Sequence, residues 1–226
     1  MAGVIVAIDG PAASGKGTLA RRLAAHFDFA FLDTGLLYRA AALHLAEAAG
    51  GAEDTAAAEA AARRVSEADL GDPRLRGEDI GQLASAVAVI PAVRQALLQF
   101  QRDFAAHPPE GKGGAVLDGR DIGTVVCPGA DAKLFVTASQ EERARRRVKE
   151  LRERGVEAIY GAVLQDMQDR DARDSRRRTA PLRPADDAFV LDTTDLDADA
   201  AFAAARDYVS KRVKNVNPPV PKEDRG

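Results

Sequence analysis

Short apolar runs alternate with longer stretches of helical pattern along this chain. The apolar runs are predicted to be buried strands, and they cover 4–8, 29–32, 115–117, 132–136 and 188–191. Strands that alternate with helices are typical of a parallel sheet with helices on both faces. The pattern therefore predicts an α/β fold.

Polar residues and glycines follow four of the five runs. They form the sequences Ile8-Asp9-Gly10, Leu32-Asp33-Thr34-Gly35, Leu117-Asp118-Gly119-Arg120 and Leu191-Asp192-Thr193-Thr194. Open α/β sheets bind their ligands at the carboxyl ends of the strands. One such ending would indicate a turn, but four in register indicate the rim of a binding site.

A glycine-rich loop, residues 10–18, connects the first strand to a helical pattern. A strand, a glycine loop, a lysine and a helix in this order predict a phosphate-binding P-loop, in which backbone N–H groups and the helix N-terminus hold a polyphosphate. The expected nucleotide-binding residues are Gly10, Pro11, Ala12, Ala13, Ser14, Gly15, Lys16, Gly17 and Thr18. An ordinary glycine-rich turn is the alternative, which the lysine spacing and the flanking elements disfavour.

The residue after the P-loop lysine bears on metal binding. Lys16 is expected to reach the β- and γ-phosphates, and a Ser or Thr usually follows it directly. Here Gly17 takes that place and Thr18 comes next, so we expect Thr18 to be the Mg²⁺ ligand. The three histidines, His26, His44 and His107, show no metal-binding spacing.

Two long excursions leave the predicted sheet. We expect one domain, 1–215, with a core formed by 1–34, 105–138 and 185–215. The first excursion, 35–104, is mostly helical and is expected to cover a ligand. The second, 139–184, is highly charged and is expected to form a helical lid. The segment 216–226 contains three prolines and four charged residues, so we expect it to be disordered.

Arginines cluster in the second excursion. Arg170, Asp174 and Arg177 have a spacing that places them on one face of a helix. Two arginines beside an aspartate can bind a phosphate while the carboxylate accepts from a sugar hydroxyl. A solvated, salt-bridged helix explains the spacing equally well.

Other arginines are open to the same two interpretations. Arg143, Arg145, Arg146 and Arg147 follow two glutamates. We favour a solvated helix with internal ion pairs for them, and contact between one of them and a nucleotide is the alternative. Arg39 and Arg120 follow strand ends, where we expect phosphate clamps rather than surface ion pairs, because phosphoryl transfer depends on positioning and charge neutralisation.

Composition narrows the choice of partners. The 226 residues carry a formal charge of −3, and only 5% are aromatic, so nothing steers the chain towards nucleic acid or an anionic membrane. No apolar segment approaches the roughly 20 residues that span a bilayer. The single cysteine, Cys127, excludes an internal disulfide and fits a reducing compartment. We expect a cytoplasmic monomer that binds small molecules.

The motifs resemble those of the bacterial cytidylate kinases. They are Ile8–Thr18, Leu32–Arg39, Ala84–Arg94, Leu117–Thr124 and Arg170–Leu182, and the resemblance runs over about 4–208. This P-loop nucleoside monophosphate kinase family transfers the γ-phosphate of ATP to CMP or dCMP. The resemblance implies a P-loop kinase fold with a five-stranded parallel sheet, a helical CMP-binding insertion and a helical lid.

The resemblance also implies roles for individual residues. Ser85, Arg94 and Asp121 would contact cytosine, Arg170 and Asp174 would hold the sugar hydroxyls, and Arg39, Arg120 and Arg177 would grip the CMP phosphate. Lys16, Arg120 and Arg177 would serve the chemistry. Thr34 stands where many relatives have serine. Residues 67–74 are too few for the β-hairpin region of many relatives, so we expect an insertion built of helices.

Three alternatives to this function differ in what they require. Another small-molecule P-loop kinase, such as one acting on shikimate, would share the loop. A GTPase switch would need an Asn-Lys-x-Asp motif, which the sequence lacks. A nucleic-acid-binding protein would be marked by salt-dependent binding, and the acidic total charge and scarce aromatics disfavour it.

Overall fold

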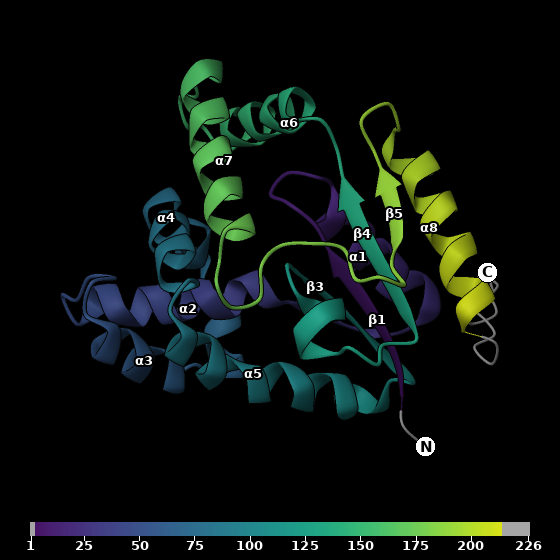
Figure 1. Ribbon diagram of the computed structural model, residues 1–226, viewed down its shortest axis with the longest axis horizontal. Coiled ribbons are helices and arrows are strands. Elements are labelled where there is room, and N and C mark those ends of the chain that lie inside the picture. The colour runs from purple at the N-terminus through teal and green to yellow at the C-terminus, as the bar shows by residue number, and fades with distance from the viewer. Residues whose placement is uncertain (1–2, 214–226) are drawn as a thin grey trace, which may run out of the picture.

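A five-stranded parallel sheet forms the centre of the computed structural model, which describes residues 3–213 (Figure 1). The strand order is β2-β3-β1-β4-β5. The strands are β1 (Val4–Asp9), β2 (Ala30–Asp33), β3 (Gly114–Gly119), β4 (Ala132–Thr137) and β5 (Phe189–Asp192). Each overlaps a predicted run, and the predicted α/β fold is confirmed.

β1 lies in the middle of the sheet and brings the polar strand ends together. Val6, Ala7 and Ile8 are fully buried. Their side chains alternate between the two faces, so Val6 and Ile8 join one apolar cluster and Ala7 joins the other. The parallel register places Asp9 opposite Gly119 of β3. The carboxyl ends of the strands therefore meet at one edge of the sheet, as the sequence predicts.

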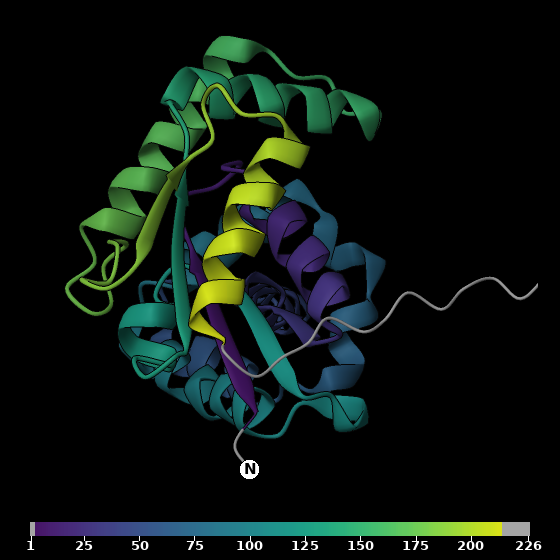
Figure 2. The ribbon, with the colours of Figure 1, turned by 90° about the vertical axis from the view of Figure 1, so that its right-hand side faces the viewer.

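Helices cover both faces of the sheet, and short 3-10 or π turns connect several of them (Figures 1 and 2). The helices and turns are α1 (Lys16–Phe27), α2 (Thr34–Glu47), α3 (Thr55–Arg63), η1 (Glu67–Gly71), η2 (Pro73–Arg76), α4 (Glu78–Val87), α5 (Pro91–Ala106), η3 (Pro109–Gly111), η4 (Ile122–Val126), α6 (Gln140–Glu153), α7 (Tyr160–Ser175) and α8 (Ala198–Arg212).

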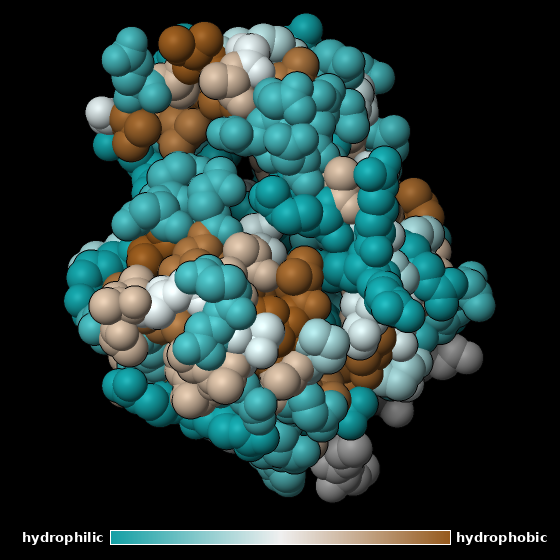
Figure 3. Space-filling view, turned by 60° about the vertical axis from the view of Figure 1, so that its left-hand side comes forward, coloured by the Kyte–Doolittle hydropathy of each residue, from teal (hydrophilic) through white to brown (hydrophobic). Residues whose placement is uncertain are grey.

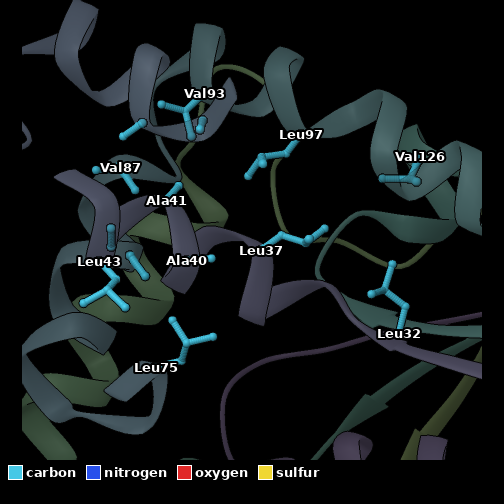
Figure 4. Packing of buried hydrophobic residues seen from close by; sticks show 14 of the residues in the cluster. Leu32, Leu37, Ala40, Ala41, Leu43, Leu75, Val87, Val93, Leu97 and Val126 are labelled. Carbon is cyan, nitrogen blue, oxygen red and sulfur yellow. The ribbon is translucent and has the colours of Figure 1, made fainter. Parts of the chain in front are cut away.

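Each face of the sheet has its own apolar cluster. α1 and α8 cover one face, where they contribute Leu23 and Val209 to the apolar cluster that contains Leu134 of β4. On the other face, α2 and α5 contribute Leu37 and Leu97 to a larger cluster, which reaches into the insertion (Figure 4). Burial of these side chains is the main stabilising contribution to the fold. The P-loop and strand ends are thus carried on a packed support.

The insertion between β2 and β3 consists entirely of helices and 3-10 turns over 35–104. Residues 67–74, predicted to be too few for a hairpin, lie in the segment formed by the two turns η1 and η2. Leu75 from η2 is fully buried in the larger cluster. The expectation of a helical insertion is confirmed.

α6 and α7 form the predicted helical lid, which stands over the carboxyl edge of the sheet (Figure 1). It has a small apolar cluster of its own, which includes Ala144, Val148 and Met167. The lid touches the insertion through an ion pair between Arg147 and Glu78. The site described below is therefore bounded by the sheet edge, the insertion and the lid.

The structure bears on two further expectations. Within 3–213, no single helix is long and apolar enough to cross a membrane, although α4 and the helical segment after it meet that test as a pair bent by 103°. The segment 216–226, expected to be disordered, lies outside the described residues.

Candidate active site

The loop between β1 and α1 has the backbone of a phosphate cradle. Gly10 has a φ of +153°, and a Cβ at this position would lie 2.0 Å from the carbonyl oxygen of Val136, so only glycine fits. Gly15 has a φ of +87° and precedes α1, whose N-terminus has no side-chain cap. The N–H groups of the first turn are therefore left for an anion.

Lys16 begins α1 and is buried beneath this cradle. Its ammonium donates to the carbonyl oxygen of Pro11 at 3.4 Å and lies 3.8 Å from the carboxylate of Asp118. Burial and, to a lesser extent, the nearby charge of Arg120 lower the pKa of Lys16 to about 8, while Asp118 offsets part of the effect. A phosphate bound beside Lys16 would favour the charged form of the ammonium and so raise its pKa again.

Asp118, at the end of β3, has an incomplete set of partners. Its Oδ1 is buried and accepts no hydrogen bond within the described residues. Burial raises the pKa of this carboxyl, and Lys16 counteracts the rise. A buried carboxylate oxygen of this kind beside a P-loop suits a hard divalent cation, which prefers oxygen ligands. The residues present therefore fit Mg²⁺.

One cavity of about 580 Å³ joins the P-loop, the strand ends, the insertion and the lid. Figure 3 shows the lid as a lobe of its own, with many hydrophilic side chains where it meets the rest of the molecule. Eleven of the predicted site residues with polar or charged side chains line this cavity, namely Lys16, Thr18, Thr34, Arg39, Ser85, Arg94, Arg120, Asp121, Arg170, Asp174 and Arg177.

Asp174 is the centre of a buried arginine cluster beside the cavity. It forms ion pairs with Arg120, at 3.1 Å, and with Arg177. Burial alone would raise the pKa of Asp174, but Arg120, Arg177 and Arg170 together hold it below its usual value. Burial, together with the neighbouring charge of Arg120, lowers the pKa of Arg170 to about 10. Arginines concentrated in this way favour a bound phosphate.

Arg177 reaches this cluster from outside the helix. α7 ends at Ser175 and Arg176 is its C-terminal cap. The prediction that Arg170, Asp174 and Arg177 share one helix face therefore holds for Arg170 and Asp174 only. Of the two interpretations of this segment, the solvated, salt-bridged helix is wrong for Asp174, which is 1% exposed.

A polar corner lies at the insertion side of the cavity. Arg94 of α5 donates to Asp121 Oδ2 at 2.5 Å, and both side chains are buried. Ser85 of α4 is also buried, and its hydroxyl accepts from Arg173 of the lid at 3.4 Å. The corner offers a carboxylate acceptor beside guanidinium and hydroxyl donors, a set suited to a flat polar ring.

Arg39 and Thr34 support the wall between the corner and the P-loop. Arg39 donates to the carbonyl oxygens of Leu75, at 2.7 Å, and Gly77, at 3.1 Å, while its guanidinium lines the cavity. Thr34 donates to the carbonyl oxygen of Asp118 at 2.8 Å. The Thr34 hydroxyl thus ties the start of α2 to the end of β3.

The solvated helix with internal ion pairs, favoured for the 143–147 arginines, is wrong for Arg143 and holds only in part for Arg146, which pairs with Glu142 at 3.0 Å but also reaches the P-loop. Arg143 is buried and donates to the carbonyl oxygen of Ala12 at 3.3 Å. Arg146 donates to the carbonyl oxygen of Ser14 at 3.4 Å and to that of Thr193 at 2.6 Å. Both reach the P-loop because α6 begins directly after β4, at the same edge of the sheet. Charge composition does not show which face of a helix turns inward.

The other two arginines differ from each other. Arg145 is a solvated helix charge, with a side chain that is 68% exposed. Arg147 lines the main cavity and pairs with Glu150 and with Glu78 of the insertion. The predicted solvated helix therefore describes Arg145 but not the whole group.

A second cavity of about 330 Å³ lies on the other side of the P-loop. Its lining includes Ser14, Thr18, Arg22, Arg146, Thr193, Leu196 and Ala201. Its lining combines apolar side chains with a few polar groups, as is common in small-molecule pockets. Arg146 lines both cavities and so connects them.

Comparison with known proteins decides the family. A profile of the cytidylate kinase family matches residues 6–211. A cytidylate kinase from Paramagnetospirillum magneticum is 64% identical over 92% of this chain and 98% of its own. A cytidylate kinase from Methylocella silvestris is 60% identical over 89% of this chain and 92% of its own.

The chain belongs to the cytidylate kinase family. The predicted resemblance and the kinase class are confirmed. An uncharacterized protein from Eubacterium ventriosum shares the fold with a TM-score of 0.51 at 16% identity, covering 92% of this chain and 99% of its own.

Two cavity residues that are absent from the predicted set stand out in this cytidylate kinase family member. Tyr38 lines the main cavity, and the guanidinium of Arg94 lies 5.5 Å from its ring centroid. It stands four residues after Thr34, a helical spacing that could have indicated it. Thr193 lines the second cavity. Its position just after the fifth predicted strand could have indicated it as a site residue.

Two predicted loop residues do not line either cavity. Gly10 is held against β4 by its contact with Val136, and Pro11 offers its carbonyl oxygen to Lys16. They shape the loop, while residues 12–18 line the cavities.

Proposed function

We propose that this kinase transfers the γ-phosphate of ATP to CMP or dCMP and releases CDP or dCDP with ADP. The observation that carries the proposal is the single cavity that joins the P-loop to the Ser85, Arg94 and Asp121 corner. The buried arginine cluster lies between the two. A donor phosphate and an acceptor base can therefore be bound at opposite ends with the accepting phosphate between them.

The donor side consists of the P-loop and the second cavity. The N–H groups at the start of α1 and the ammonium of Lys16 would hold the phosphates, and the second cavity would take the donor base. Within the described residues, no group of three or more His, Cys, Asp or Glu side chains could hold a metal ion alone. Thr18 and Asp118 would hold Mg²⁺ together with the nucleotide's phosphates, and the cation would neutralise phosphate charge.

The transfer itself needs charge stabilisation rather than a covalent intermediate. Lys16, Arg120 and Arg177 would stabilise the negative charge of the moving phosphoryl group. Arg39 would bind the CMP phosphate, and Arg170 and Asp174 would hold the sugar hydroxyls. Because Asp174 also pairs with Arg120 and Arg177, it would orient the arginines as well as the sugar.

The polar corner explains the choice of base. Cytosine presents an amine donor beside N3 and O2 acceptors, so Asp121 would accept from the amine while Arg94 and Ser85 donate. Uracil presents a carbonyl oxygen where cytosine has the amine. That oxygen would face the Asp121 carboxylate and leave both acceptors unpaired, which costs more than a lost hydrogen bond.

Replacement of Asp121 tests the base assignment. We expect Asp121→Ala to lower kcat/KM for CMP strongly and that for UMP little, so their ratio falls by at least about tenfold, the effect of one unpaired polar group. Steady-state kinetics with both nucleotides measures the ratio. The control is Asp166→Ala on the exposed side of the lid, and an unchanged ratio for Asp121→Ala would contradict the assignment.

The pKa of Lys16 predicts how ATP binding depends on pH. Since that pKa is lowered to about 8, the Lys16 side chain is charged near neutrality and loses its proton, and with it its charge, as the pH rises above 8. ATP binding favours the charged form, so the affinity should be steady below this value and fall above it. Calorimetric titration from pH 7 to 9.5 measures this, and a fall that persists in Lys16→Met would contradict the role of Lys16.

Two further parts of the proposal concern the setting of the reaction. We propose that the protein works in a reducing cytoplasm, because its single cysteine forms no disulfide. We also keep the prediction of a monomer that acts on small molecules. Gel filtration of the pure protein tests the oligomeric state.

A further inference from the structure

Asp9, the last residue of β1, is a buried carboxylate whose use lies outside the roles assigned above. Its Oδ1 accepts from the N–H of Ile122 at 2.7 Å, and its Oδ2 accepts from the N–H of Gly123 at 2.8 Å. Over 3–213 no Lys, Arg or His side chain forms an ion pair with it. Burial raises the pKa of Asp9 to about 7, although the two N–H groups oppose the rise. A buried carboxylate kept at this cost has a specific task.

The two N–H groups belong to the first turn of η4, a five-residue π-helix. The other end of η4 is held by Arg102 of α5, which donates to the carbonyl oxygens of Val125, at 3.1 Å, and Val126, at 3.0 Å. The ionised form of Asp9 at the N-terminus and the cation of Arg102 at the C-terminus match the direction of the helix dipole. Both ends of this turn are therefore fixed by charged side chains from other elements.

η4 follows directly after Asp121 and determines where that residue lies. The carbonyl oxygen of Asp121 accepts from the N–H groups of Val125, at 2.8 Å, and Val126, at 3.2 Å. Its φ of −145° and ψ of 25° belong to neither a strand nor a helix, so the turn imposes this conformation. From this backbone the Asp121 side chain reaches Arg94 and the cavity. π-helical turns are frequent at functional sites.

We propose that Asp9 and Arg102 are positioning residues for base recognition, which hold η4 at its two ends and thereby aim Asp121 at the acceptor base. The inference rests on the proposed function, in which Asp121 binds cytosine. Asp9 also directly precedes Gly10 of the P-loop. The strand that carries the donor loop therefore also anchors the turn that reads the acceptor.

The first test separates the acceptor from the donor. Asp9→Asn keeps one acceptor oxygen and turns an amide towards the other N–H, so one backbone donor loses its partner. We expect the KM for CMP to rise about tenfold and the CMP to UMP ratio of kcat/KM to fall, as one unpaired buried group implies. The KM for ATP and kcat should change much less, and Arg102→Gln should act in the same direction more weakly.

Val6→Ala is the matched control, because Val6 is buried in β1, as Asp9 is, but points to the face of the sheet opposite to that of Asp9. It should lower the melting temperature without changing the base ratio. A rise in the KM for ATP equal to that for CMP would overturn the proposal. If Asp9→Asn fails to fold, Arg102→Gln decides, and an unchanged base ratio in that folded variant would overturn it.

A double-mutant cycle gives the second test. If Asp9 acts through Asp121, Asp9→Asn should have no further effect on the base ratio in an Asp121→Ala background. Additive effects of the two substitutions would overturn the positioning role alone and leave the proposed function intact. A base ratio that Asp121→Ala itself leaves unchanged would overturn both.

Discussion

Lys16→Met should leave a folded protein that has almost no phosphoryl-transfer activity. Lys16 is buried at the start of α1, with its ammonium facing the cavity beside Asp118. Removing a preorganised charge from the transferring phosphate costs about 10²–10³-fold in turnover. Methionine has a similar length and fills the same buried space, so we expect the protein to fold, with a lower melting temperature because Asp118 loses its cationic neighbour.

Steady-state kinetics and circular dichroism, measured on the same preparations, check this expectation. Lys149→Met is the control, because the Lys149 side chain is 79% exposed on the lid. It should behave as wild type in both measurements. A folded Lys16→Met protein with near-normal turnover would remove the catalytic role of the P-loop lysine.

Arg120→Ala and Arg177→Ala should each lower turnover by about a hundredfold, a typical effect of lost positioning at a transferring group. Both guanidinium groups pair with Asp174 and line the cavity. Each variant leaves Asp174 with one direct arginine partner, so we also expect a lower melting temperature. Kinetics at saturating CMP and thermal denaturation separate the two effects.

Arg145→Ala is the matched control for this pair, since Arg145 belongs to the same lid but is mostly exposed. It should leave turnover and melting temperature within error of wild type. Arg146 is unsuitable as a control, because it contacts Ser14 of the P-loop. If Arg145→Ala proved as damaging as Arg177→Ala, the division of the lid into inward and outward arginines would be wrong.

The layout of the sheet was predictable because its strands are short and uniformly apolar. In β1, for example, Val6–Asp9 are buried and the apolar side chains reach both faces of the sheet, and no helical pattern competes with the strand. The glycines of the P-loop were predictable for a different reason. The φ angles of Gly10 and Gly15 are ones that residues other than glycine rarely adopt. Glycines are therefore needed at these two positions, and their spacing indicates the loop from the sequence alone.

The direction of individual arginines was not predictable in this way. Arg143 and Arg145 are two residues apart on α6, yet one is buried against the P-loop and the other is exposed. Which face of α6 turns inward depends on the position and direction in which the chain leaves β4, and the tertiary fold determines both. The roles of Asp9 and Arg102 were hidden for the same reason, since each acts on a turn more than 20 residues away in sequence.

Phosphorylation of cytidine monophosphates with ATP can be measured directly on the pure protein. Release of ADP, measured in a coupled assay with ATP and Mg²⁺, should be compared for CMP, dCMP, UMP, AMP, GMP and shikimate under identical conditions. We expect CMP and dCMP to be phosphorylated with much higher kcat/KM than the other acceptors, because only cytosine would pair with Asp121, Arg94 and Ser85 together. Preference for UMP, AMP, GMP or shikimate over CMP would contradict this expectation.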